Sequence, residues 1–248
     1  MQLKKNKLGA AKNIRFVSVA GKEAPFNYTE AFKSLRTNLN FLTNTSGVRS
    51  ILITSAVPEE SKSTTAINLA ITLADSGHSV VLVECDLRKP VLRKYLKREL
   101  GQTGLAAYLA GLVTLDDCIV DLTDLGISVI GAGVVPPNPS ELLNTTRMQE
   151  LVELLKHNYD YVILDAPPVT VVTDAAVVGR LTDGALLVVR SKFASARTVR
   201  QAKAKLENVG IRILGGVLTR FNMRKSGWRA GYDYNQYEYG YGQRRAGR

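Results

Sequence analysis

Runs of consecutive apolar, β-branched residues alternate along the chain with segments in which apolar residues recur every three or four positions. The first kind of pattern predicts buried strands at Ser50–Thr54, Ser79–Glu84, Ile127–Ile130, Tyr159–Leu164, Gly184–Val189 and Ile213–Leu218. The second kind predicts helices at Ser63–Asp75, Ser140–Lys156, Asp174–Leu181 and Ala196–Val209. Fully apolar strands that alternate with helices indicate an α/β fold, with a mostly parallel sheet flanked by helices on both faces.

A further helix is expected ahead of the first strand, between Tyr28 and Phe41. Its apolar residues recur at helical spacing at Phe32, Leu35, Leu39 and Leu42, and Thr29 is a candidate N-cap. We therefore expect three regions: a basic N-terminal arm at residues 1–27, one globular domain at 28–220, and a flexible tail rich in Tyr, Arg and Gly at 221–248.

Composition and charge narrow the class of protein. The 248 residues are 45% hydrophobic, which suits one large core, and the uncharged runs are too short to cross a bilayer. The basic opening segment lacks the apolar stretch of a secretion signal, so we expect an intracellular protein. The two cysteines, Cys85 and Cys118, have no metal-ligand spacing and are expected to be buried thiols.

The net charge of +11 is concentrated near the C-terminus. Residues 190–248 contain fourteen Lys or Arg against three Asp or Glu, a balance of 14 − 3 = +11. An excess of this kind is typical either of a surface that meets an anionic partner or of a solvated basic face.

The segment ILITSAVPEESKSTTAINLA (residues 51–70) has the order strand, turn and helix start that a phosphate-binding loop requires. Lys62 would contact phosphate and Ser63 a magnesium ion, while the main-chain N–H groups of Glu59, Glu60, Ser61, Lys62, Ser63 and Thr64 would surround the anion. The usual glycines are replaced by Ala56 and Ser61. If Ser61 needs a left-handed backbone, its side chain costs about 1–2 kcal/mol.

Carboxylates end two of the expected strands. VVLVECDLRKP carries Glu84 and Asp86, and YVILDAPPV carries Asp165. Because the carboxyl ends of parallel strands share one edge of the sheet, these side chains should face the phosphate-binding loop. Carboxylates at that position hold magnesium through water and orient an attacking hydroxyl.

The end of the chain, YDYNQYEYGYGQ, contains five of the ten tyrosines: Tyr232, Tyr234, Tyr237, Tyr239 and Tyr241. A packed core would not place aromatic residues among so many Gly, Asn and Gln residues. Together with Lys62–Ser63, Glu84 and Asp86, Asp165, PPNPSELL (residues 136–143) and DAPPV, this cluster resembles the bacterial tyrosine kinases of Firmicutes that act in capsule or exopolysaccharide synthesis.

The resemblance implies a P-loop NTPase fold of the SIMIBI type, ATP and Mg²⁺ as cofactors, and autophosphorylation of the tail tyrosines by a neighbouring subunit. It implies that Lys62 bridges the β- and γ-phosphates and that Ser63, Asp86 and Asp165 hold Mg²⁺, partly through water. It also implies that Glu84 faces the incoming phenol.

The same resemblance implies partners. The family helix motif E-x-x-R-x-x-R, which joins subunits in a ring, corresponds here to Glu30, Lys33 and Arg36. A transmembrane adaptor of the polysaccharide co-polymerase type would place the kinase at the inner face of the cell membrane. Other protein tyrosines are expected as substrates, and nucleic acid is not.

Three positions depart from the family pattern: Ser61, Lys33 in the middle of the helix motif, and Glu84, where the family usually has Asp. They keep open a weakly active or inactive P-loop scaffold whose tail binds RNA or polysaccharide machinery. A partitioning ATPase of the same fold is a further alternative. That class carries a signature lysine early in the loop, and this chain has Val57 there.

Overall fold

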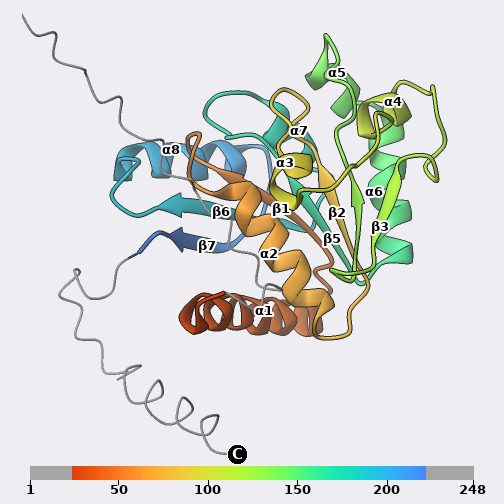
Figure 1. Cartoon of the computed structure of the whole chain (residues 1–248). Helices are drawn as coiled ribbons and strands as arrows, with labels where there is room; N and C mark the ends of the chain where they lie inside the picture. Colours follow the sequence, from red (N-terminus) through yellow and green to blue (C-terminus); the bar gives the residue numbers. More distant parts are fainter. Residues whose placement is uncertain (1–23, 222–248) are drawn as a thin grey trace, which may run out of the picture.

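The computed structural model describes residues 24–221, which form a single seven-stranded sheet between two layers of helices (Figure 1). The strand order is β3-β4-β2-β5-β1-β6-β7. The strands are β1 (Ser50–Ser55), β2 (Val80–Glu84), β3 (Ile119–Leu122), β4 (Ile127–Ile130), β5 (Tyr161–Asp165), β6 (Gly184–Arg190) and β7 (Ile213–Thr219). All pairings are parallel except that of β3 with β4. The expected α/β class and mostly parallel sheet are confirmed.

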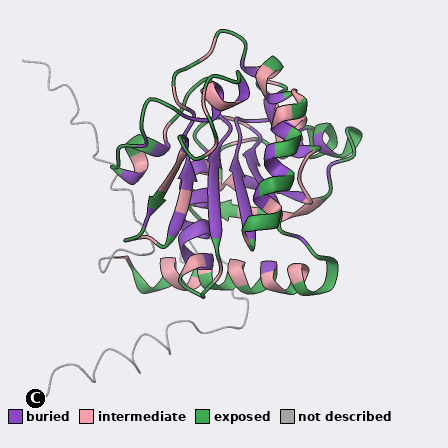
Figure 2. Ribbon diagram, turned by 90° about the vertical axis from the view of Figure 1, so that its right-hand side faces the viewer, coloured by how far each residue is buried: buried purple, intermediate pink, exposed green. Residues whose placement is uncertain are grey.

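The helices divide between the two faces of the sheet. One face is covered by α2 (Lys62–Ala74) and α3 (Leu92–Leu96), and α1 (Phe26–Ser46) packs against α2 on the same side. The other is covered by α4 (Leu105–Leu109), α5 (Pro139–Leu143), α6 (Thr146–Asn158), α7 (Asp174–Gly179) and α8 (Ala196–Asn208). Figure 2 shows the strands buried between these layers, with α1 lying crosswise below them.

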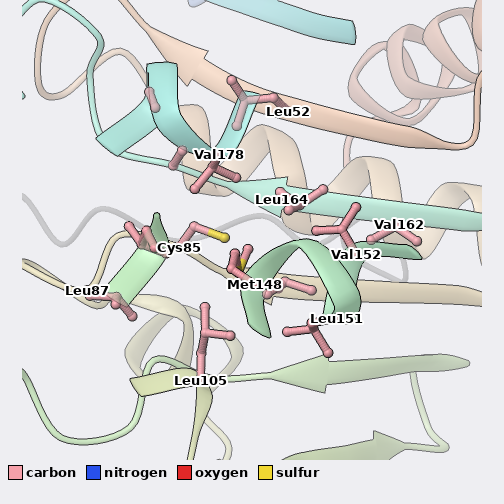
Figure 3. Close-up of a cluster of buried hydrophobic side chains, with 14 of the residues drawn as sticks. Leu52, Cys85, Leu87, Leu105, Met148, Leu151, Val152, Val162, Leu164 and Val178 are labelled. Carbon is pink, nitrogen blue, oxygen red and sulfur yellow. The ribbon is translucent and has the colours of Figure 1, made fainter. Parts of the chain in front are cut away.

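Each strand contributes alternate side chains to two separate cores, because successive residues of a strand point to opposite faces. Ile51 and Ile53 pack on the side of α2, whereas Leu52 packs on the other side. In the second core, Leu52 lies next to Val178 of α7, and Val162 lies next to Val152 of α6 (Figure 3). This two-sided burial accounts for the unbroken apolar runs that made the strands recognisable.

Several helix boundaries differ from the expectation, most clearly those of the first helix and of the segment 140–156. The first helix begins at Phe26 after Pro25, so Thr29 lies inside α1 and is not its N-cap. The helix expected over Ser140–Lys156 is two helices, because α5 ends before Asn144 and Thr145 starts α6 by accepting a hydrogen bond from the N–H of Met148. The short elements β3, α3 and α4 were not predicted.

The topology brings the ends of three strands to one place. β1 lies between β5 and β6, and β5 also pairs with β2. Glu84 is in register with Asp165, and the N–H of Cys85 donates to the carbonyl of Asp165 at 2.9 Å. The loop after β1 and the segments after β2 and β5 are therefore neighbours at the carboxyl edge of the sheet, where ligands bind in this class of fold.

Candidate active site

The loop between β1 and α2 turns left-handed at two residues that are not glycine. Ser61 has a φ of 72° and Glu59 a φ of 66°. Ser61 therefore adopts the left-handed backbone that the sequence analysis considered for it. The left-handed conformation of Glu59 was not predicted, since the missing glycines of the motif fall at Ala56 and Ser61. Each such residue costs about 1–2 kcal/mol, so the surrounding contacts must hold the loop in shape.

The main-chain N–H groups of residues 59–64 donate no hydrogen bond within the part of the chain that the structure describes. Three carbonyl oxygens of the loop instead accept hydrogen bonds from side-chain hydroxyl groups. Ala56 accepts from Thr170 at 2.5 Å, Val57 from Ser55 at 2.8 Å, and Ser61 from Thr65 at 3.0 Å. The loop is thus fixed through its acceptors, and its donors stay available for an anion at the start of α2.

Lys62, the first residue of α2, lies between the two carboxylates that the sequence assigned to the site. Its Nζ atom is 3.1 Å from Oδ2 of Asp86, 3.3 Å from Oδ1 of Asp165, and 3.3 Å from Oγ of Ser63. Asp165 is the last residue of β5, and Asp86 follows the end of the adjacent β2. The structure therefore brings Lys62, Ser63, Asp86 and Asp165 together.

The electrostatics of this cluster follow from its burial. Burial raises the pKa of Asp165, and nearby Lys62 only partly opposes that effect. Burial lowers the pKa of Lys62, but the charges of Asp165 and Asp86 outweigh it, so the net direction is upward. The lysine therefore stays charged at neutral pH, and it compensates two carboxylates that would otherwise repel each other.

These residues fit a magnesium ion. Oδ2 of Asp165 is buried and has no hydrogen-bond partner among the described residues, although a buried carboxylate oxygen normally has one. The Asp86 carboxylate and the Ser63 hydroxyl are close by, and oxygen ligands of this kind suit Mg²⁺. Between residues 24 and 221 no three His, Cys, Asp or Glu side chains are grouped to hold a metal.

Glu84 has a different environment from the one that the sequence suggested. Oε1 accepts from the N–H groups of Val91 at 2.5 Å and Leu92 at 2.7 Å, and Oε2 accepts from that of Ala132 at 3.1 Å. The residue is 2% exposed, and burial raises the pKa of its carboxyl above the ordinary value. With both oxygens occupied, the carboxylate joins the start of α3 to the end of β4 rather than facing an open site.

The three helix residues expected at a subunit interface lie on α1. Nζ of Lys33 is 2.7 Å from Oε1 of Glu30, in an exposed pair of the kind that contributes well under 1 kcal/mol. Nη1 of Arg36 donates at 2.9 Å to the carbonyl of Thr72, in the last turn of α2. Arg36 thus satisfies a helix-end carbonyl of its own chain. The five tail tyrosines and most of the basic arm lie outside the described residues.

Sequence reasoning missed a polar cluster that supports the loop after β2. Arg88 binds the fully buried Asp174 at the start of α7 through Nε (2.8 Å) and Nη2 (3.1 Å). Ser140 of α5 contacts both, at 2.7 Å from Arg88 and 2.6 Å from Asp174. The signature PPNPSELL contained Ser140, but no local pattern indicated its partners.

A strand, a phosphate-binding loop and acidic strand ends arranged in this way define a P-loop nucleotide-binding domain of the α/β class. Residues 51–212 match a family model described as an AAA domain. The tyrosine-protein kinase YwqD of Bacillus subtilis (strain 168) is 34% identical over 197 residues, 79% of this chain and 83% of the relative. The chain therefore belongs to the family of bacterial tyrosine-protein kinases.

Three further comparisons describe the similarity, two with a tyrosine kinase and one with a protein of another name. The tyrosine-protein kinase etk of Escherichia coli (strain K12) is 37% identical over 87% of this chain, which spans only 29% of that longer protein. The solved kinase domain of Escherichia coli ETK has a TM-score of 0.80 at 35% identity, over 92% of this chain and 89% of that one. The septum site-determining protein MinD of Pyrococcus horikoshii, solved with Mg-ADP, has a TM-score of 0.60 at 25% identity, over 68% and 69%.

None of the helices found between residues 24 and 221 combines the length and the apolar character needed to cross a membrane.

Proposed function

We propose that the protein is an ATP-dependent tyrosine kinase that phosphorylates its own C-terminal cluster in trans and regulates capsule or exopolysaccharide synthesis. The substrate tyrosines are Tyr232, Tyr234, Tyr237, Tyr239 and Tyr241. The observation that carries the proposal is the meeting of Lys62 with Asp86 and Asp165 beside a loop whose N–H groups are uncommitted.

In this proposal the phosphates of ATP bind at the start of α2. The N–H groups of residues 59–64 contact phosphate oxygens, and the Lys62 ammonium leaves its two carboxylates to bridge the β- and γ-phosphates. Ser63, Asp86 and Asp165 would hold Mg²⁺, which supplies charge neutralisation between the phosphates when it is bound.

The transfer step joins the phenol oxygen of an incoming tyrosine to the γ-phosphorus and breaks the bond from that phosphorus to the β–γ bridging oxygen. ADP leaves, and the phenol gives up its proton. A free phenol has a pKa near 10, so the site contributes mainly by positioning the hydroxyl in line. Because Asp86 and Asp165 are assigned to Mg²⁺, the phenol proton passes to solvent water.

We assign Glu84 to positioning rather than to the phenol. Its carboxylate accepts three main-chain hydrogen bonds at the root of the loop that carries Asp86. The side chain is also only 2% exposed, so a substrate hydroxyl could reach it only if these segments moved apart. Each charge-assisted bond broken by that movement is worth about 1.5–3 kcal/mol. The family usually has Asp at this position. The longer Glu side chain reaches the main chain of both neighbouring segments, at the start of α3 and after β4.

We further propose the partners that the family resemblance implies. They are a ring of identical subunits joined through the α1 face that carries Glu30, Lys33 and Arg36, and a transmembrane adaptor that holds the kinase at the inner membrane face. The exposed position of the Lys33–Glu30 pair leaves both side chains accessible for exchange with a second chain. Sedimentation of the chain with and without Lys33→Glu tests the ring.

The test of kinase activity is incubation of the full chain with ATP and Mg²⁺, followed by blotting for phosphotyrosine. Wild type should label, and Lys62→Met should not, since methionine is an unbranched side chain of similar shape that carries no charge. The wild type is also tested with the adaptor's cytoplasmic segment added. If the folded protein binds Mg-ADP but still acquires no phosphotyrosine, the result would favour the scaffold alternative.

A further inference from the structure

Glu60 is a fully buried carboxylate inside the phosphate-binding loop. Its residue exposure is 0%. Oε2 accepts from the N–H of Val57 at 3.0 Å, and Oε1 accepts from the N–H of Arg190 at 3.2 Å. Its carbonyl oxygen accepts from Oγ1 of Thr219 at 3.0 Å. One residue therefore joins the beginning of the loop to the ends of β6 and β7.

This burial needs a physical reason, because a carboxylate removed from water is costly unless its oxygens are hydrogen-bonded. Glu60 lies between Glu59 and Ser61, the two residues held at positive φ without being glycine. Those two backbone conformations are unfavourable by themselves, so contacts with the rest of the protein must hold them in place. Glu60, the residue between them, is well placed to make such contacts. The side chain of Glu60 supplies that constraint by closing the loop onto Val57 and fastening it to the sheet.

The same geometry leaves the phosphate-binding groups untouched. A carboxylate can only accept hydrogen bonds, and those of Glu60 come from Val57 and Arg190, which lie outside residues 59–64. Nη1 of Arg190 also approaches the carbonyl of Glu59 at 3.4 Å, so β6 holds two successive residues of the loop. The loop is constrained on one side, and its N–H groups remain free on the other.

We propose that the Glu60 side chain is a positioning residue for the nucleotide: it replaces the missing glycines as the element that keeps the loop in its phosphate-binding shape. The inference rests on the proposed function only in taking the loop to bind a nucleotide. It predicts that loss of the carboxylate weakens the binding of phosphates more than it slows phosphoryl transfer at saturation.

The test compares Glu60→Gln and Glu60→Met in the full chain. Gln retains one acceptor oxygen and presents a donor to the other N–H, whereas Met fills similar space and accepts nothing. The Kd for magnesium-ADP, measured by calorimetry, should rise about 10- to 100-fold in Glu60→Gln, the effect of one charge-assisted bond, and further in Glu60→Met. The KM for ATP should follow, while kcat stays within about threefold in Glu60→Gln.

The matched control is Glu153→Gln, the same chemical change at a side chain of α6 that is 65% exposed. It should leave Kd and KM unchanged. Circular dichroism and thermal unfolding establish the folded fraction of each variant, since a merely structural role would lower kcat through loss of folded protein at unchanged KM. Folded Glu60→Gln with a Kd within threefold of wild type would overturn the inference. Because magnesium-ADP binding is measured without tyrosine transfer, failure of the kinase proposal would show separately.

Discussion

Arg88 and Asp174 form a two-bond ion pair, Nε to Oδ2 at 2.8 Å and Nη2 to Oδ1 at 3.1 Å, that joins the loop after β2 to the start of α7. Asp174 is completely buried, and Ser140 is its other partner. The loop so anchored contains Asp86, whose Oδ1 accepts from the N–H of Lys89 at 3.1 Å. The pair therefore fixes a segment that carries a proposed magnesium ligand.

Arg88→Met should lower the free energy of unfolding by about 2–3 kcal/mol, because it leaves a buried carboxylate without its charged partner. Arg88→Lys, which keeps the charge but loses the planar fork, should lower it by about half as much. Thermal unfolding is the measurement, at about 2–4 °C per kcal/mol for a chain of this size. Equal midpoints for wild type and Arg88→Met would contradict this assignment.

Replacing Glu84 separates a positioning role from a proton-accepting one. In Glu84→Gln the amide nitrogen must face one of three main-chain N–H groups, so one buried donor loses its acceptor, at about 1–3 kcal/mol. We expect a lower unfolding midpoint and turnover within about tenfold of wild type, measured well below that midpoint. Turnover slowed by about two orders of magnitude or more, with unchanged stability, would instead assign Glu84 to the phenol.

Ser61→Gly should stabilise the protein. Removing the Cβ relieves about 1–2 kcal/mol of left-handed strain, while the greater freedom of glycine in the unfolded chain returns about 0.4–1 kcal/mol. The net gain of about 0.5–1 kcal/mol corresponds to a rise in midpoint of about 1–4 °C. Ser34→Gly in α1, the same change in an exposed helix interior, should lower the midpoint. A fall in both variants would show that Ser61 is not strained.

The stability contributed by Asp183 should depend on pH. Burial alone would raise its pKa, but the N–H groups of Ser50 and Arg49 and the Lys156 ammonium outweigh burial and hold the pKa below its ordinary value. Because the folded pKa is lowered, the contribution is complete above the unfolded pKa of about 3.9 and is lost as the pH falls through the folded value.

Asp183→Asn should therefore lower the free energy of unfolding by about 2 kcal/mol at pH 7, and by progressively less below about pH 4. Urea unfolding of both chains at pH 7, 4.5 and 3.5 measures the difference. If the difference were the same at all three values, charge would not be the source of the effect.

The sheet was predictable because its central strands are buried on both faces, so that residues such as Leu52 and Ile53 are apolar in succession. Strand β3 escaped notice because it is four residues long and largely half-exposed. The five-residue helices α3 and α4 are too short to show a helical period. The division of α5 from α6 depends on the cap at Thr145, which the continuous apolar pattern concealed.

At the site, Lys62, Asp86 and Asp165 could be assigned together because parallel strands bring their carboxyl ends to one edge. The partners of Glu84 could not, since the N–H of Ala132 is 48 residues away in the sequence. Nor could the side chain of Glu60, whose contact with Arg190 spans 130 residues. Motif spacing predicts which groups meet the ligand, whereas the supporting contacts depend on tertiary packing.

If this phosphate-binding loop transfers phosphate to the tail of another subunit, a mixture of two variants should show the transfer. One chain carries Lys62→Met with its tail intact, and the other keeps Lys62 but has phenylalanine at Tyr232, Tyr234, Tyr237, Tyr239 and Tyr241. Neither should acquire phosphotyrosine when incubated alone with Mg-ATP. Together they should label, on the Lys62→Met chain. A mixture without label, although the second chain binds Mg-ATP, would show that no phosphate passes between subunits.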